Sequence, residues 1–314
     1  MDRSVFMDGI INLNKPAGIS SHGAVAEVRR LVPGVRVGHA GTLDPAATGV
    51  LPICLGRATR VVEYLVELRK GYRAAIELGV ATSTGDAEGE VVSRSDVPLL
   101  ERPEIEKLLQ SLTGVQRQKT PPYAAAKHRG RPLYEYARRG ERVPVKMRTV
   151  EIYRLDLLAY SPGEAPHIIC EVECSKGTYI RELAEEMGRR LGCGAHLHAL
   201  ERLFVGPFEI GNAVSPEALA RAAAGGGFRE MLLPMDRALE HFEALSVPDT
   251  VVNDLRAGRA VPWSRLEEAG LCRHQPGSRM LRIYNTVGHF KALARIHGAG
   301  VDMVLKTVKF LASS

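Results

Sequence analysis

The sequence predicts an α/β (α+β) fold with a small β-rich module at the C-terminus. Residues 72–80 and 167–174 alternate apolar and polar side chains with the period of a strand. A helical pattern follows the second of these directly, and short strands and turns prevail after Pro248. Because 314 residues exceed one average domain, we expect a large domain, residues 1–246, and a small one, residues 247–314.

The N-terminal segment predicts a strand, a turn and a helix in that order. Residues 9–15 are apolar enough for a buried strand, and the KPAG sequence at its end is typical of a turn. Ser20 or Ser21 can then cap a helix that continues to about Leu31.

The stretch GHAGTLDPAATG, residues 38–49, predicts a loop with one carboxylate near its centre. Its glycines and its proline disfavour regular structure, and Pro45 pushes the backbone of Asp44 towards extended conformations. Taken alone, Asp44 fits an Asx-turn or a helix cap, but a well-braced aspartate can also act as a nucleophile or a base. An apolar segment and a helical stretch near 58–68 follow the loop.

The alternating strand at 72–80 is followed by the loop TSTGDAEGE, which predicts a hairpin-like connection to Val91 and Val92. Ser83 and Asp86 both lie in this loop.

The strand at 167–174 precedes a helix for which Thr178 is the expected N-cap. Arg181 then lies in the first turn, where a cation opposes the helix dipole, so an anionic partner would explain its position. Further on, Ser215, Pro216 and Glu217 give the order of N-cap, proline and early acid that begins a helix.

Composition excludes several classes of protein. Hydrophobic residues make up 45% and charged residues 25%, with no apolar run that could span a bilayer. The N-terminus lacks an apolar stretch with a cleavage site for export, so we expect a cytoplasmic protein. Five cysteines without a C-x-x-C pair favour buried thiols, and His196 and His198 alone are too few ligands for a metal site. We therefore expect no metal.

Basic charge is concentrated in one window. The net charge of the chain is +6, and residues 117–148 contain ten Lys or Arg against two Glu. Tyrosines and prolines interrupt this window, and basic residues that bind phosphates combined with aromatic residues that stack on bases suit RNA.

Seven segments in the same order resemble the tRNA pseudouridine synthase B (TruB) family, which isomerises uridine-55 in the T loop of tRNA. They cover about residues 9–238 and are NKPAGISS, GHAGTLDPAATGVLPICLG, KGYRAAIELGVATSTGD, TPPYAAAKHRGRPLYEYAR, CSKGTYIREL, HALERLFVGPF and LLPMDRAL. The C-terminal part resembles a PUA RNA-binding module through GRAVPW, FKALARI and VLKTVKF.

The resemblance implies a pseudouridine-synthase fold with a central mixed, mainly antiparallel sheet flanked by helices. It implies an isomerase that binds the T arm of tRNA, needs no cofactor and no obligatory protein partner, and acts as a monomer. The basic window would be an insertion that closes over the T arm. Residues 1–246 would form the catalytic domain and residues 247–314 the PUA-like domain.

The resemblance also implies the roles of individual residues. Asp44 would be the catalytic group, Tyr72 would stack on the flipped uracil, and Arg181 would pair with Asp44. His39 would fill the space that the flipped base leaves in the T loop. The remaining substrate-side set is Tyr179 and Leu200 lining the pocket, Lys15 bracing the loop together with Pro16, and Arg129, Arg131 and Arg138 in the basic window.

Three other functions remain compatible with parts of the sequence. An RNA-binding or RNA-chaperone protein would need the basic window but not the combination of Asp44, Tyr72 and Arg181. A hydrolase that uses Asp44 with Asp86 or Glu88 would release free base or sugar. A dyskerin-like enzyme would depend on a guide RNA, although the tRNA-type insertion and the lack of long basic tails favour the stand-alone enzyme.

Overall fold

A computed structural model describes residues 7–121, 123, 126–141, 143, 146–271 and 279–312 of the chain. Nine strands of these residues form one sheet. They are β1 (Gly9–Lys15), β2 (Val37–His39), β3 (Thr48–Leu55), β4 (Lys70–Leu78), β7 (Gly114–Lys119), β10 (Met147–Ser161), β11 (His167–Cys174), β12 (Ala195–Val205) and β13 (Phe208–Glu209).

The order in the sheet is β1-β3-β12-β4-β11-β10-β7, with β2 beside β3 and β13 beside β12. All of these pairs are antiparallel except β3 with β12, which run parallel where Thr48 and Gly49 face Glu201 and Arg202. The predicted mixed, mainly antiparallel sheet is therefore confirmed. At the parallel junction the two backbones approach closely, because a Cβ atom at Gly49 would lie 2.3 Å from the Arg202 carbonyl oxygen.

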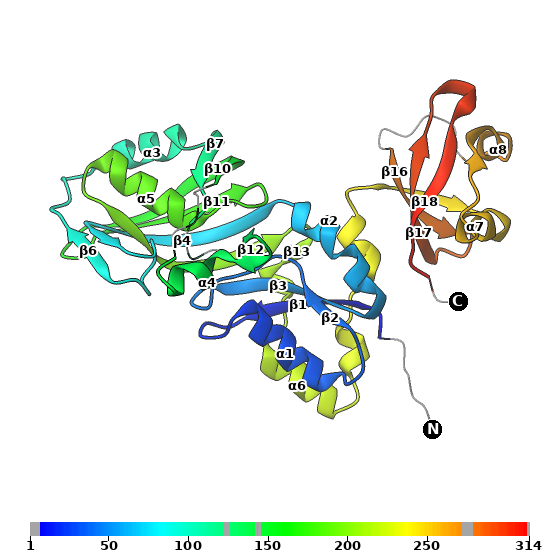
Figure 1. The fold of residues 1–314 in the computed structure, drawn as a ribbon, viewed down its shortest axis with the longest axis horizontal. Coiled ribbons are helices and arrows are strands. Elements are labelled where there is room, and N and C mark those ends of the chain that lie inside the picture. The colour runs from blue at the N-terminus through cyan, green and yellow to red at the C-terminus, as the bar shows by residue number, and fades with distance from the viewer. Residues whose placement is uncertain are drawn as a thin grey trace.

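Helices flank this sheet in two groups (Figure 1). One group packs on the half of the sheet that contains β4, β10 and β11, and the other on the half that contains β1 and β3. The first group is α3 (Arg102–Ser111) and α5 (Ile180–Leu191), and the second is α1 (Ser21–Leu31) and α6 (Pro216–Ala224). A 3-10 turn (Gly56–Val61) leads into α2 (Val62–Glu67), where the sequence predicted one helical stretch.

The N-caps observed in the structure can be compared with those that the sequence predicts. Ser20 caps α1 by accepting from the Gly23 N–H, and Ser215 caps α6 by accepting from the Ala218 N–H, as predicted. The prediction of Thr178 as the N-cap of α5 was wrong, because Tyr179 occupies that position without a side-chain cap. The Thr178 hydroxyl instead donates to the Ser175 carbonyl at 3.0 Å and closes the preceding turn.

The predicted hairpin after β4 is present as β5 (Val80–Thr82) paired antiparallel with β6 (Val91–Arg94). Ser83 stabilises the base of its loop. The Ser83 N–H donates to the Glu90 carbonyl at 2.8 Å, and its hydroxyl accepts from the Glu90 N–H at 3.0 Å.

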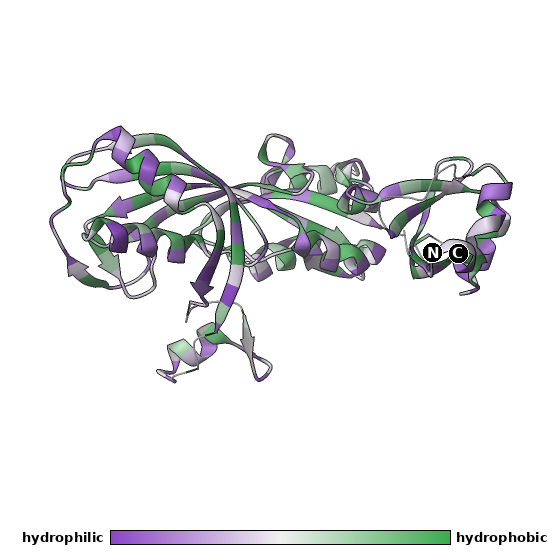
Figure 2. Cartoon of the chain, turned by 90° about the horizontal axis from the view of Figure 1, so that it is seen from above, coloured by the Kyte–Doolittle hydropathy of each residue, from purple (hydrophilic) through white to green (hydrophobic). Residues whose placement is uncertain are grey.

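The basic window begins in β7 and ends in β10, and its middle contains β8 (Lys127–His128), β9 (Arg131–Pro132) and α4 (Leu133–Arg138). These short elements project away from the sheet (Figure 2). Arg129 forms the turn between β8 and β9 with a φ of 48°, which is the left-handed region.

A second sheet has the order β14-β16-β17-β18-β15. Its strands are β14 (Glu243–Val247), β15 (Val261–Pro262), β16 (Met280–Asn285), β17 (Phe290–His297) and β18 (Val304–Phe310). The predicted β-rich module is thus confirmed, but β14 begins at Glu243, so four of its five residues lie before the expected boundary at 246/247. The sequence also missed two short helices packed on this sheet, α7 (Asp249–Arg256) and α8 (Trp263–Glu268).

The second sheet packs against α2 and the 3-10 turn before it (Figure 1). Leu293 and Leu311 share an apolar cluster with Leu65, and the Arg60 guanidinium donates to the Phe310 carbonyl at 2.6 Å. Lys309 forms an ion pair with Glu63.

Four cysteines, Cys54, Cys170, Cys174 and Cys193, are free and buried, as the sequence predicted, and Cys272 lies outside the described residues. In the part of the chain that the structure describes, no helix has both the length and the apolar character needed to cross a membrane.

Candidate active site

The loop between β2 and β3 presents Asp44, and side chains from three distant elements hold this loop in place. Ser21 at the start of α1 clamps the neighbouring residue: its hydroxyl accepts from the Leu43 N–H at 2.8 Å and donates to the Leu43 carbonyl at 3.0 Å. The Gly18 N–H donates to the Pro45 carbonyl at 3.0 Å. The backbone on both sides of Asp44 is therefore fixed.

Lys15, at the end of β1, also stabilises this loop. Its side chain is completely buried, and its ammonium donates to the carbonyls of Pro16, Ile19 and Pro45 at 2.8, 2.8 and 3.1 Å. Burial, with a smaller contribution from Arg202, lowers the pKa of Lys15 to about 8, although Asp44 acts in the opposite direction. All three donors are directed at protein carbonyls, so the position of Lys15 suits a brace.

Arg202 on β12 supports the first part of the loop. Its buried guanidinium donates to the carbonyls of Val50, Gly41 and Thr42 at 2.7, 3.1 and 3.4 Å. Gly41 itself has a φ of 89°, which favours glycine. The sequence analysis did not single out Arg202, because a lone arginine in a strand pattern gives no sign of a partner in a distant loop.

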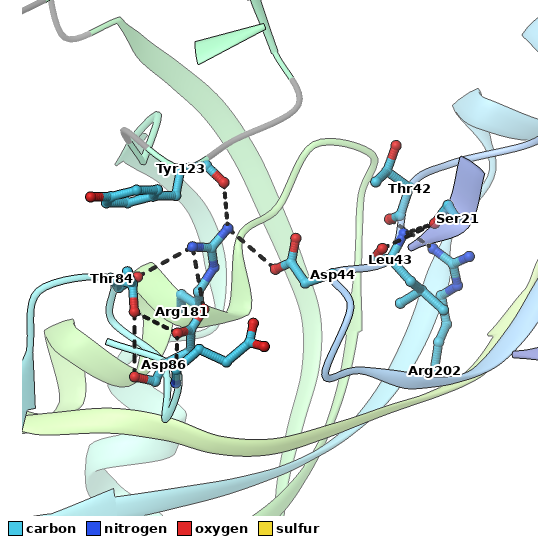
Figure 3. A network of polar contacts seen from close by, with 10 residues as sticks. Ser21, Thr42, Leu43, Asp44, Thr84, Asp86, Tyr123, Arg181 and Arg202 are labelled. Carbon is cyan, nitrogen blue, oxygen red and sulfur yellow. Dashed lines mark hydrogen bonds and ion pairs between the residues drawn. The ribbon is translucent and has the colours of Figure 1, made fainter. Parts of the chain in front are cut away.

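Arg181 on α5 lies between two carboxylates (Figure 3). Its guanidinium is 3.2 Å from Asp44 Oδ2 through one nitrogen and 3.4 Å from Asp86 Oδ2 through the other. The same nitrogens donate to the carbonyls of Tyr123 and Thr84 at 3.2 Å each. The anionic partner predicted from the helix position of Arg181 is thus a pair of aspartates, one on each side.

The sequence analysis named Asp86 only for the alternative hydrolase and did not predict its contact with Arg181. It is held in the β5–β6 loop, where it accepts from the Thr84 hydroxyl and from the Glu88 N–H at 3.2 Å. The carboxylate of Asp86 is 16% exposed and that of Asp44 is 42% exposed, while the Arg181 side chain is 5% exposed. Asp86 therefore anchors the guanidinium from the protein side, and Asp44 faces the more open side.

The groups around Asp44 shift the pKa of its carboxyl in opposite directions. Burial raises the pKa of the Asp44 carboxyl above its usual 3.8, and Asp86 contributes in the same direction. Arg181 lowers this pKa more than any other neighbour, and Lys15 also lowers it. The net direction is upward, so the ionised form of Asp44 depends on Arg181.

A cleft of about 830 Å³ opens beside these residues. Its lining brings together most of the residues that the sequence singled out: Asp44, Tyr72 and Arg181 with His39, Tyr179 and Leu200. Arg148, Lys176 and Ala126 also line it, so part of the insertion reaches the cleft. A site of this size accommodates a nucleoside.

The two tyrosines present rings to the cleft from different elements. Tyr72 lies on β4, is 7% exposed, and has a pKa that burial raises to about 12, so it is a neutral phenol at pH 7. Tyr179 precedes α5 and is fixed by Gln118, whose amide donates to the Tyr179 carbonyl and accepts from its N–H. The Arg148 guanidinium lies 5.1 Å from the centre of the Tyr179 ring.

His39 ends β2 at the edge of the cleft. Its ring makes an edge contact with His22, at 5.2 Å between ring centres, and its buried Nδ1 has no hydrogen-bond partner among the described residues. Burial lowers the pKa of His39 to about 4, and the charges of His22 and Arg202 contribute, so the imidazole is neutral at pH 7.

The basic residues proposed from the insertion do not line this cleft. Arg129 is an exposed turn residue, and Arg131 lies 3.7 Å from Glu135 Oε2 and 5.0 Å from the centre of the Tyr136 ring. Arg138 ends α4, and its side chain lies outside the described residues.

Comparison with known proteins agrees with this arrangement. Residues 29–180 match the model of the TruB family pseudouridylate synthase N-terminal domain, and residues 181–240 match that of the tRNA pseudouridylate synthase B C-terminal domain. Proteins named tRNA pseudouridine synthase B are similar over most of the chain. The one from Geobacillus thermodenitrificans is 45% identical over 80% of this chain and 85% of its own. The one from Ectopseudomonas mendocina is 42% identical over 94% and 93%.

Solved structures show the same fold. A chain from the crystal structure of a Cbf5-Nop10-Gar1 complex superposes with a TM-score of 0.74 at 25% identity, covering 98% of this chain and 86% of that one. Three bacterial relatives, 42–45% identical, carry this same name. This chain therefore belongs to the TruB family of pseudouridine synthases.

Proposed function

We propose that this protein isomerises uridine-55 in the T loop of tRNA to pseudouridine, with Asp44 as the catalytic group. The observation that carries the proposal is the Asp44 carboxylate, held on a braced loop at the edge of a nucleoside-sized cleft and 3.2 Å from the Arg181 guanidinium. The name shared by the relatives supports tRNA as the substrate.

The reaction breaks the bond between ribose C1′ and uracil N1, rotates the base, and joins C1′ to C5. The proton at C5 leaves and N1 gains a proton, so no oxidant or reductant takes part. A positioned carboxylate is the group that this reaction needs, as nucleophile or as base. We propose that the enzyme uses no cofactor.

The cleft residues fit roles around a flipped base. Tyr72 offers a neutral ring that can stack on uracil, and Tyr179 and Leu200 form further walls. His39, neutral and at the cleft edge, is suited to fill the space that the base leaves in the T loop. Lys15 holds the Asp44 loop and does not contact RNA in this proposal.

Binding of the T arm is assigned to two regions outside the cleft. One is the projecting insertion, with Arg129, Arg131 and Arg138, and the other is the C-terminal module, residues 247–314, which contains most of the second sheet. On the second sheet, Arg295 and Lys306 face each other on β17 and β18, and both are exposed. Like charges directly opposite each other on neighbouring strands are unfavourable, so this pair is suited to a phosphate.

We further propose that the enzyme acts as a monomer in the cytoplasm, on tRNA alone. The Cbf5 chain resembles this one at 25% identity and was solved in a complex with other proteins. The relatives above 40% identity are named for tRNA, which favours the stand-alone enzyme over the guide-dependent alternative.

Release of tritium from the C5 position of uridine in an unmodified tRNA transcript tests this proposal. We expect release from one T-loop uridine by the purified protein alone, and no change in the mass of unlabelled tRNA treated in the same way. A hydrolase would instead release free uracil, and an RNA chaperone would bind without releasing tritium.

The Asp44→Asn variant tests the catalytic assignment. Asn keeps the size of Asp44 and removes its charge, so the loop should still fold and tRNA should still bind while turnover is lost. Asp156→Asn on β10, which is exposed and paired with Arg154, is the matched control and should retain full activity. Tritium release by folded Asp44→Asn at the parent rate would overturn the assignment.

A further inference from the structure

Glu77 on β4 is surrounded by three histidines from the neighbouring strands. Its register partner on β11 is His167, and its register partner on β12 is His196. Register partners in a sheet point to the same face, so both imidazoles lie beside the Glu77 carboxylate. The spacing of His196 and His198 in the sequence does not reveal this cluster, because Glu77 and His167 are distant along the chain.

The third histidine reaches the same carboxylate through a β-bulge. The register of β12 on β4 shifts between Leu197 and Ala199, which leaves His198 as the extra residue. Bulges re-aim side chains in this way. As a result, one oxygen of Glu77, Oε2, lies 3.2 Å from His198 Nδ1, 3.6 Å from His167 Nε2 and 3.8 Å from His196 Nε2.

Backbone carbonyls fix the orientation of two of these rings from behind. His196 Nδ1 lies 3.1 Å from the Val80 carbonyl oxygen, and His167 Nδ1 lies 2.6 Å from the Ala165 carbonyl oxygen. A carbonyl only accepts, so each Nδ1 carries a proton, and the Nε2 atom of each ring lies on the side of Glu77. An imidazole held by a carbonyl in this manner is the usual arrangement behind a metal ligand.

We propose that Glu77, His196 and His198 form a zinc site, and that His167, which lies beside Glu77 but outside this close group, turns towards the ion as the fourth ligand. Ligands at about 2.0–2.1 Å from a tetrahedral zinc ion are about 3.3–3.4 Å from one another. The three distances from Glu77 Oε2, 3.2–3.8 Å, bracket this value. The ligand atoms of Glu77, His196 and His198 all lie within 4.8 Å of one another. Nitrogen ligands and one carboxylate suit zinc.

The site is separate from the cleft. Tyr72 and Glu77 are an odd number of positions apart on the same regular strand, so their side chains point to opposite faces of the sheet. His198 is 49% exposed, which gives an ion access from solvent, whereas His196 is 5% exposed. A bound ion would link β11, β4 and β12 without contacting the substrate, so we assign it a structural role.

Equilibrium dialysis of the metal-free, full-length protein against zinc tests the proposal. We expect one zinc ion per chain, and weaker binding as the pH falls and the imidazoles are protonated. His198→Gln removes a half-exposed ligand without opening the core and should weaken binding by at least about 10-fold to 100-fold, the loss typical for a residue that merely supports a ligand. Glu77→Gln should have a similar effect.

Two controls separate this site from other zinc ligands. His297→Gln on β17 is exposed and remote from the cluster, so it should leave the affinity unchanged. All proteins should carry Cys272→Ser to remove a thiol that lies outside the described residues. Visible absorption of the cobalt-substituted protein should show a tetrahedral site that His198→Gln abolishes.

Two results would overturn the proposal. One is the absence of stoichiometric zinc binding, which would leave the cluster as ion pairs between Glu77 and the histidines only. The other is binding of equal strength in the parent, His198→Gln and Glu77→Gln proteins. Tritium release from tRNA by His198→Gln should equal that of the parent, since His198 does not line the cleft.

Discussion

Removal of the Arg181 guanidinium should destabilise the protein chiefly by leaving Asp86 without a cation. Arg181 and Asp86 are 5% and 16% exposed, and breaking such a buried pair by removing one partner costs about 3–5 kcal/mol. We expect Arg181→Met to lose this amount. Asp86→Asn should lose less, about 1–3 kcal/mol, because Arg181 keeps Asp44 as a countercharge and Asn still accepts hydrogen bonds.

The double variant makes the prediction specific. Arg181→Met leaves two carboxylates facing each other, and Asp86→Asn removes one of them. The double variant should therefore be about 1–3 kcal/mol more stable than the sum of the two single losses implies. Urea unfolding at pH 7, followed by circular dichroism, measures all four proteins.

The control combines Arg181→Met with Asp254→Asn on α7, where Asp254 pairs with Arg259 and Arg265. This pair of substitutions should be additive to within about 0.5 kcal/mol. If Arg181→Met and Asp86→Asn are equally additive, the shared guanidinium does not couple the two loops and the reasoning fails.

Three further predictions follow from the charges. Because Asp86 raises the pKa of Asp44, Asp86→Asn should shift the acid limb of the rate of tritium release to lower pH; a shift to higher pH would contradict this. Replacing Arg129 and Arg131 with Gln should flatten the log–log salt dependence of tRNA affinity by about 0.7–0.9 per lost phosphate contact, and an unchanged slope would place the RNA elsewhere. Arg295→Gln should weaken tRNA binding yet raise stability by about 0.2–1 kcal/mol in thermal unfolding, and a loss of both would indicate a packing role.

Local patterns in the sequence predicted the local structure well. The alternation at 167–174 predicted β11, because one face of this strand is buried against α5. Ser215 predicted the start of α6, since its partner is three residues away. Thr178 failed for a local reason as well: its hydroxyl had a competing acceptor in the preceding turn.

The candidate site was predictable only where a family pattern names the residue. Asp44 and Arg181 carry such patterns, but the loop geometry around them depends on Ser21, Asp86 and Arg202. Each of these contacts a residue far along the chain, and no periodicity or spacing records that contact. The sequence did not predict the contacts of Glu77 with the histidines for the same reason, because these histidines lie on β11 and β12.

The bonds from Arg202 to the Asp44 loop also determine when the site can form. Arg202 and the Thr42 carbonyl are 160 positions apart, and the Gly49 junction joins β3 to β12 over a similar separation. Contacts of this range form late, because a long stretch of chain must be ordered before they can close. A nascent chain that has not yet reached β12 therefore has Asp44 but lacks the arginine that positions its loop, so the ribosome must finish most of the chain before the protein can act.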